Sequence, residues 1–163
     1  MSGFSVANNI TLRSYYATYR AFTTKSTRSS ATTNQLNYAD AQALRRAVQK
    51  LDDFDFENAD KDDISSHVRA FIDTYNSTMD SAKSSTNSYA TSTYKNLKNL
   101  ASKYSKDLEN IGIKENSSGY LTLSSSAVEN ISGSRFKSLL NKDFMKQLTT
   151  YAKRMANNID YYA

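Results

Sequence analysis

Between residues 64 and 111 the apolar positions recur at the spacing of one helix face. Thirteen intervals cover 47 residues, about 3.6 residues per step, and no glycine or proline interrupts them. The pattern predicts one straight helix over residues 63–109, about 69 Å long at about 1.5 Å per residue. The stripe is thin in its serine-rich middle and consists of Ile64, Val68, Phe71, Tyr75, Met79, Ala82, Thr86, Tyr89, Thr93, Leu97, Leu100, Tyr104, Leu108 and Ile111.

A shorter helix is predicted just before this stretch. Residues 36–51 are rich in Ala, Leu, Gln and Arg, and their apolar positions share one face. An acidic connection follows, and Asp62 and Asp63 stand where the long helix begins. Carboxylates are favoured there because they accept hydrogen bonds from unpaired backbone amides and face the positive end of the helix dipole. The two helices are expected to form a hairpin.

A change of period after residue 111 predicts a small β-hairpin over residues 111–123. Gly112 has the character of a residue that ends a helix, and Leu121 and Leu123 alternate with polar neighbours. The Asn-Ser-Ser-Gly sequence between the strands places Gly119 where a turn requires a positive φ. The hairpin is therefore expected as an appendage on a helical protein.

Two further helices are predicted toward the C-terminus. Ser124 or Ser125 can cap a short helix over residues 125–132, which Gly133 ends. A short apolar turn with Phe136, Leu139 and Leu140 comes next. The last helix is predicted over residues 143–161, where apolar residues follow one another at steps of three and four.

Residues 1–34 are expected to be a flexible polar arm, and residues 35–163 a single helical domain. The arm is rich in hydroxyl groups, contains no acid, and has no apolar core of a cleavable secretory signal. A transit peptide is an alternative interpretation of this composition. Tyr15, Tyr16, Tyr19 and Phe22 lie three and four residues apart, so they can form a helical stripe against a partner. The predicted fold class is all-α, an elongated helical hairpin or bundle.

The composition predicts a narrow core that is completed by association. Ser, Thr and Asn supply 54 of the 163 residues, and there is no Cys, Pro or Trp. This excludes a disulfide scaffold and a thiolate metal site. No stretch reaches the roughly 18–20 apolar residues of a membrane span. The residues expected to pack within the chain or against a partner are Phe71, Tyr75, Leu97, Leu100, Tyr104, Phe144, Leu148, Tyr151, Met155 and Ile159.

Charge is distributed unevenly along the chain. The net charge of +5 arises from +6 over residues 1–51, −6 over residues 52–63 and +5 over residues 64–163. Such a balance permits binding to nucleic acid without arguing for it. A basic helical protein associated with nucleic acid is therefore the alternative function.

Groups that carry catalysis or bind metals are sparse. His67 is the only histidine, and a histidine in the first turns of a helix is expected at the surface. The acids that begin at Asp53 alternate as in a calcium loop, but Asn58 and Ile64 replace the glycine and glutamate that this loop requires. With four glycines, the chain also lacks a phosphate-binding loop. We therefore predict no enzyme, no cofactor and no metal.

Two segments resemble the flagellar filament-capping protein family (hook-associated protein 2, FliD-like) over about residues 64–140. The first is a helix segment, Val68 to Asn76, similar to the family's "FV-D-x-YN" sequence. The second is similar to the family's "IGI…dG-x-L-x-L" hairpin, and the two occur in the family's order. The matching residues are Phe71, Ile72, Asp73, Tyr75, Asn76, Ile111, Gly112, Ile113, Gly119, Leu121 and Leu123.

The resemblance implies a structural or protein-interaction module of a flagellum or another surface appendage. Its partner would be another protein, such as a flagellar component, or a second copy of the chain, and its action would be helix packing. The resemblance also implies an extracellular or flagellar location, with a cytoplasmic one expected otherwise. We expect the Tyr15–Phe22 stripe and the last helix to pair with each other or with another subunit.

Overall fold

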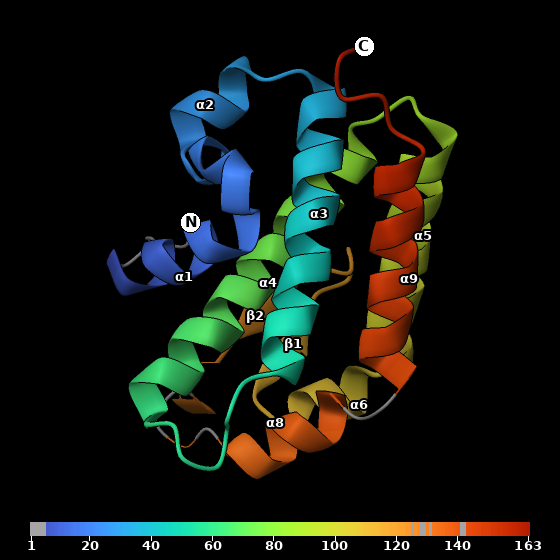
Figure 1. The fold of residues 1–163 in the computed structure, drawn as a ribbon. Helices are drawn as coiled ribbons and strands as arrows, with labels where there is room; N and C mark the ends of the chain where they lie inside the picture. The colour runs from blue at the N-terminus through green and yellow to red at the C-terminus, as the bar shows by residue number, and fades with distance from the viewer. Residues whose placement is uncertain (1–5, 125, 128–129, 131, 141–142) are drawn as a thin grey trace.

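The computed structural model describes residues 6–124, 126–127, 130, 132–140 and 143–163 (Figure 1). It confirms an all-α fold with one small β-hairpin. The α-helices are α1 (Val6–Tyr16), α2 (Lys25–Ser30), α3 (Thr33–Asp52), α4 (Lys61–Lys83), α5 (Ser88–Lys103), α6 (Ser105–Glu109), α8 (Gly133–Leu140) and α9 (Asp143–Asn157). A 3-10 helix, η1 (Ala17–Thr23), follows α1, and the strands are β1 (Ile113–Glu115) and β2 (Leu121–Leu123).

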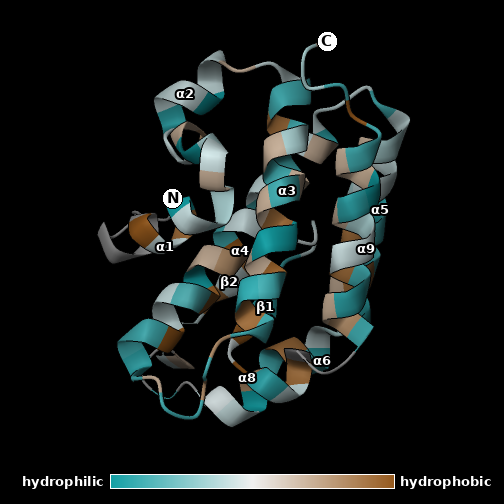
Figure 2. Ribbon diagram, viewed as in Figure 1, coloured by the Kyte–Doolittle hydropathy of each residue, from teal (hydrophilic) through white to brown (hydrophobic). Residues whose placement is uncertain are grey.

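Helices α3, α4, α5 and α9 form a closed bundle in which each helix contacts two others (Figure 1). The apolar residues of these helices are largely buried, and the hydropathy colouring shows that they alternate with polar residues along α3 and α9 (Figure 2). Small side chains allow α3 to approach its neighbours closely, because Ala39, Ala43 and Ala47 are all buried on its inner face. The core therefore lies inside one chain. None of the described helices is long and apolar enough to cross a bilayer.

The prediction of one helix over residues 63–109 is wrong, because the chain turns back between α4 and α5. A new helix begins after Asn87. The Asn87 Oδ1 accepts hydrogen bonds from the amides of Tyr89 and Ala90 and so caps the N-terminus of α5. The Ser85 hydroxyl accepts another from the Asn87 amide at 3.1 Å. Short polar side chains compete in this way with helical hydrogen bonds. The predicted rod becomes two packed helices, so the expected elongated shape and single long central helix are also wrong.

The predicted stripe nevertheless describes the buried faces on both sides of the turn. Its positions from Ile64 to Ala82 are buried on α4, and Leu97, Leu100 and Leu108 are buried after it. Only Thr86 and Tyr89, at the turn itself, are exposed. The period of about 3.6 identified the inner face of each helix. It carried no information on whether the helices were joined end to end.

The prediction of a flexible arm is wrong for the described part of residues 1–34. Helix α1 packs against α3 and α4, with Leu12, Tyr15 and Tyr16 buried in the core. An ion pair holds α2 to α3: Arg28 Nη1 and Nη2 lie 2.7 and 2.8 Å from the two carboxylate oxygens of Asp40. Asp40 is fully buried.

The Tyr16 hydroxyl also donates a hydrogen bond to Asp40. Burial and the neighbouring Asp40 carboxylate raise the pKa of Tyr16 well above its usual range, so the phenol remains a donor. A buried carboxylate without partners is strongly destabilising. The acid on the inner face of α3 therefore requires the N-terminal segment, and the fold begins well before residue 35.

The β-hairpin is confirmed with its expected turn residues. Strands β1 and β2 are antiparallel, with Ile113 opposite Leu123 and Glu115 opposite Leu121. Gly112 and Gly119 have φ values of 85° and 86°, in the region that favours glycine. The hairpin packs against α4 and α6.

The C-terminal boundaries differ from the prediction. Helix α8 begins at Gly133, where a helix was expected to end, and contains the predicted apolar turn. Within the predicted helix 125–132, residues 126–127 are helical and residues 125, 128–129 and 131 lie outside the described part. Helix α9 ends at Asn157 rather than at residue 161. The chain then brings Tyr161 against Tyr19, with ring centroids 5.5 Å apart, so the C-terminus meets the Tyr15–Phe22 segment.

Candidate functional site

The two segments that carry the family resemblance meet in space. On α4, the Asn76 Nδ2 donates to the Leu121 carbonyl oxygen at 2.8 Å, and its Oδ1 accepts from the Leu121 amide at 2.9 Å. One side-chain amide thus pairs both backbone groups of a β2 residue, as a neighbouring strand would. We call this contact, with the adjacent Tyr75, the hairpin clamp.

Tyr75 joins three elements at the same place. Its hydroxyl lies 3.1 Å from the Leu97 carbonyl of α5 and 3.0 Å from the Gly119 carbonyl of the hairpin turn, and it can donate to either. Burial raises the pKa of Tyr75 far above its usual range, which keeps the hydroxyl protonated. Nearby, the Tyr120 hydroxyl donates to an Asp80 carboxylate oxygen at 2.8 Å. The turn of the hairpin is therefore fixed to α4 and α5.

The remaining residues of the resemblance surround the hairpin clamp. Phe71, Ile72, Ile113 and Leu121 are buried, and Ile111 and Leu123 are partly buried against the core. Asp73 is half-buried, and burial raises the pKa of its carboxyl to about 6 against the opposing effect of Arg69. The structure thus brings the two predicted segments together, with their apolar members in the core.

The ten residues predicted to pack within the chain or at an interface lie in this chain's own core. Phe71, Tyr75, Leu97, Leu100, Phe144, Leu148, Met155 and Ile159 are buried, and Tyr104 and Tyr151 are partly buried. The Tyr104 and Phe144 rings meet edge to face at 5.3 Å, which joins the end of α5 to the start of α9. The side chains of these apolar stripes are buried or partly buried within the single chain.

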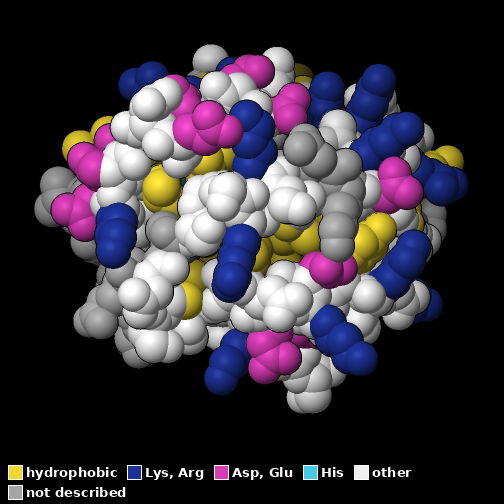
Figure 3. All heavy atoms as spheres, turned by 90° about the horizontal axis from the view of Figure 1, so that it is seen from below, with side chains coloured by type: hydrophobic (Ala, Val, Ile, Leu, Met, Phe, Trp, Pro, Cys, Tyr) yellow, Lys and Arg dark blue, Asp and Glu magenta, His cyan; other side chains and the backbone are white. Residues whose placement is uncertain are grey.

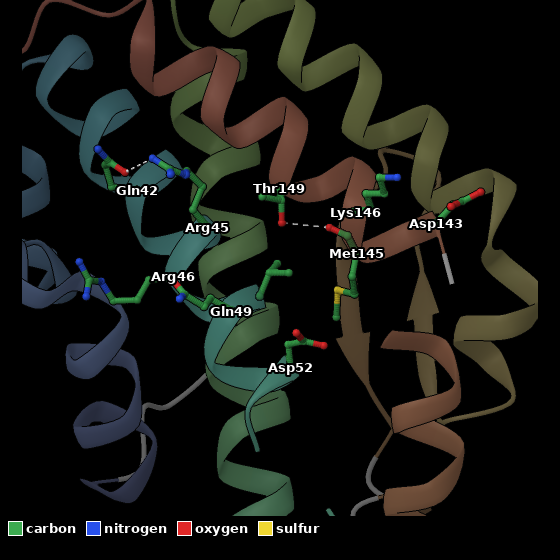
Figure 4. A pocket seen from close by; sticks show the side chains of 10 residues that line it. Gln42, Arg45, Arg46, Gln49, Asp52, Asp143, Met145, Lys146 and Thr149 are labelled. Carbon is green, nitrogen blue, oxygen red and sulfur yellow. Dashed lines mark hydrogen bonds between the residues drawn. The ribbon is translucent and has the colours of Figure 1, made fainter. Parts of the chain in front are cut away.

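A groove of about 580 Å³ runs between α3 and α9 (Figure 4). Polar and charged side chains dominate its lining, and Val48 and Met145 are apolar. The groove is lined by Gln42, Arg45, Arg46, Val48, Gln49, Asp52, Asp143, Met145, Lys146 and Thr149. The residues of α3 and α9 are about a hundred positions apart in the chain, so no local pattern could predict the groove.

Among the described residues, none of the charged groups that line this groove forms an ion pair. The one ion pair that the described residues form, Arg28 with Asp40, involves no residue of the groove lining. Arg45 donates instead to the Gln42 amide oxygen at 3.0 Å, and the Thr149 hydroxyl donates to the Met145 carbonyl (Figure 4). The groove lining contains no histidine, cysteine or serine, and its one hydroxyl is already engaged. The groove can bind a polar or charged group, and no pair of nucleophile and base is arranged in it.

The single histidine and the acidic connection have structural partners. His67 Nδ1 lies 2.9 Å from the Asp63 carbonyl, and its ring packs on Phe54 at 4.2 Å. Asp55 accepts from the backbone amides of Glu57 and Asn58 and from the Asn58 side chain. These bonds form a local turn and lower the pKa of Asp55. No cluster of three metal-ligating side chains exists among the described residues.

Comparisons with protein families, with curated proteins and with solved structures found no match to this chain.

Proposed function

We propose that this chain is a non-enzymatic, protein-binding module of a bacterial surface appendage, of the kind that flagellar filament caps represent. The hairpin clamp is the observation that supports this proposal. Asn76 and Tyr75 belong to one resembling segment and bind the backbone of the other, at Leu121 and Gly119. The residues that resemble the family therefore share one structural task, which is to hold a rigid hairpin against a helical bundle.

In this proposal the module binds partners through polar and charged surfaces. The apolar stripes are occupied by the chain's own core and leave few large apolar side chains for a partner. Among the described residues, Ile10, Tyr89 and Tyr162 are the exposed large apolar side chains, and they lie on separate elements. Binding between charged surfaces weakens as the salt concentration rises, whereas binding through an apolar face is not weakened by screening.

The location of the chain in its own bacterium tests this function. Surface appendages are sheared from cells that produce an epitope-tagged chain, and are separated from cell bodies and cytosol before immunoblotting. The chain is expected in the appendage fraction, and the signal is expected to be lost from a strain without filaments. Recovery only in the cytosol, together with nucleic acid, would instead support the alternative of a nucleic-acid-associated protein.

A pair of asparagine variants links this result to the hairpin clamp. Asn76→Ala removes both bonds to Leu121 and should reduce recovery in the appendage fraction. Asn99→Ala changes an exposed asparagine of α5 and serves as the matched control. Equal recovery of the two variants, with unchanged helicity by circular dichroism, would show that the hairpin clamp is not needed for the location of the chain in the appendage.

A further inference from the structure

Helices α5 and α9 carry six bases and one acid, Asp143, and a seventh base, Lys106, lies on α6 directly after α5. The sequence contains no Asp or Glu between residues 88 and 106 or between residues 144 and 159. The helices are antiparallel, because Asn87 meets Asn158 at one end and Tyr104 meets Phe144 at the other. We call this surface the basic pair; its residues are Lys95, Lys98, Lys103, Lys106, Lys146, Lys153 and Arg154.

Among the described residues, none of the bases of the basic pair forms an ion pair. The one ion pair among the described residues lies elsewhere, between α2 and α3. Six of the seven basic side chains are exposed, and only Lys98, which packs against Gly119, is half-buried. Arg154 lies over the Tyr89 ring at 5.6 Å, an arrangement that leaves its charge uncompensated. Clustered charge of one sign attracts a partner of the opposite sign.

The chain also carries a surface of opposite charge. Residues 52–63, which we call the acidic segment, contain seven acids and Lys61, a net charge of −6. All seven acidic side chains are exposed. Contacts of Phe56 with Phe136 on α8 and the Asp55 turn hold the segment in place. Seen from below, several acidic side chains lie at the upper left, and Lys and Arg predominate on the right (Figure 3).

We infer that the acidic segment of one copy docks on the basic pair of a second copy. The inference deepens the proposed function, on which it rests, by naming the partner of the module. The net charge of −6 on the acidic segment is opposite in sign to the seven bases of the basic pair. The two surfaces are different, although Asp52 and Lys146 line the same groove. A contact between unlike surfaces builds a ring, of which a two-fold dimer is the smallest, or an open filament. A nucleic acid would occupy the basic pair and leave the acidic segment unpartnered, whereas a second copy satisfies both.

Light scattering at two salt concentrations tests the contact. At about 0.1 M salt, where the Debye length is about 10 Å, the mass should exceed the 18.3 kDa of one chain and rise with concentration. At about 1 M salt, where that length is about 3 Å, the mass should fall to 18.3 kDa. A constant mass of 18.3 kDa at low salt, or association that survives high salt, would overturn the inference.

Two neutralised variants test which surfaces meet. The acid-neutral variant carries Asp53→Asn, Glu57→Gln and Asp62→Asn at exposed positions. Asp53 ends α3 through its backbone amide, which the change to asparagine leaves in place. Alone it should remain at 18.3 kDa in low salt, because its basic pair finds no acidic segment. Circular dichroism confirms that it keeps the helical content of the parent chain.

The base-neutral variant carries Lys95→Gln, Lys153→Gln and Arg154→Gln, and should also be monomeric alone. An equimolar mixture of the two variants restores one contact and should give a dimer of about 37 kDa, twice the 18.3 kDa of one chain, that grows no further. The control Lys25→Gln, at an exposed base of α2, should associate like the parent chain. A mixture that stays monomeric would overturn the inference.

Binding to a DNA duplex is measured in parallel. If the parent chain stays monomeric and binds duplex with an affinity that falls steeply with salt, the basic pair serves nucleic acid and the inference is wrong. The proposed function fails separately, by absence from the appendage fraction. A monomer found on appendages would overturn only the self-association, and a self-associating chain confined to the cytosol would overturn only the proposed location.

Discussion

Two short segments are attached to the α3–α4 pair by different chemistry. The hairpin is held by neutral side chains that bind backbone groups, through Asn76 and Tyr75. The N-terminal segment is held by a buried ion pair, Arg28 with Asp40, to which Tyr16 adds a hydrogen bond. The first attachment lies between segments predicted from local sequence, whereas the second joins a predicted helix to a segment expected to be flexible.

The comparison shows how differently the two attachments depend on their partners. Removing a neutral hydrogen bond leaves unpaired polar groups, which costs about 1–3 kcal/mol for each buried group. Removing one member of a buried ion pair leaves a charge without compensation, which costs about 3–5 kcal/mol. The N-terminal attachment should therefore be all-or-none, and the hairpin attachment should weaken in steps.

The largest effect is expected for Asp40→Asn. This change keeps the size of the side chain but leaves the charge of Arg28 without the carboxylate that binds it. We expect a loss of about 3–5 kcal/mol in the free energy of unfolding, measured by urea denaturation. Proteolysis should cut the chain before residue 33, because α1 and α2 lose their attachment to α3.

Lys25→Ala, at an exposed position of α2, is the control for this variant and should change stability by less than about 0.5 kcal/mol. An Asp40→Asn protein with the stability of the control would show that the ion pair does not hold the N-terminal segment.

A smaller loss is expected for Asn76→Ala. Both backbone groups of Leu121 lose their partner, so the free energy of unfolding should fall by about 2–3 kcal/mol. The amide of Leu121 should then exchange its hydrogen much faster, while amides of α3 stay protected relative to global unfolding. Slow exchange at Leu121 in this variant would mean that the hairpin is held by its apolar contacts instead.

Tyr75→Phe separates the single hydroxyl from the rest of the hairpin clamp. The ring remains in the core, and only the bonds to the Leu97 and Gly119 carbonyls are lost. We expect a decrease of about 1–2 kcal/mol in the free energy of unfolding. A loss as large as that of Asp40→Asn would contradict the distinction between neutral and ionic attachment.

The smallest effect on stability is expected from the titration of Asp73. Burial raises the pKa of Asp73 to about 6 from an ordinary value near 4, so the folded state binds the proton more tightly than the unfolded state. The free energy of unfolding should therefore decrease as the pH rises from about 4 to about 6, by about 1 kcal/mol once solvent screening of this half-buried group is included. Asp73→Asn should remove this dependence, as measured by urea midpoints across that pH range. A variant with the parent's pH profile would assign the effect to another group.

Turn chemistry explains which local predictions succeeded. The hairpin was predicted from the alternation of Leu121 and Leu123 and from the Asn-Ser-Ser-Gly turn, in which Gly119 was expected at a positive φ. The positive φ of Gly119 in the structure agrees with this turn. The turn at Ser85 and Asn87 contains neither glycine nor proline. Serine and asparagine are tolerated inside a helix and also cap the start of one. Tertiary packing therefore decides between one continuous helix and a turn followed by a second helix. The stabilising contact of α5 with α4 and α9 is a tertiary one.

The hairpin clamp was likewise predicted only in its local parts. The two resembling segments were found in the sequence, but their contact through Asn76 requires residues 45 positions apart to meet. The position of Asp40 could have predicted a buried ion pair. It is the one acid of the first 51 residues and lies on an apolar helix face. A carboxylate at such a position requires a cation nearby, and Arg28 is among the few available.

By itself, the sequence determined the helical class, the inner face of each helix, the hairpin with its turn, and the separation of the acidic segment from the stretches 88–106 and 144–159, which contain no acid. These features depend on residues close together in the chain, whose spacing sets which side chains share a face. Tertiary structure alone decided that α5 folds back, that the N-terminal segment belongs to the core, and that α5 and α9, which carry six bases, lie side by side. Each of these depends on groups that meet only after folding, because burial and charge pairing act between distant parts of the chain.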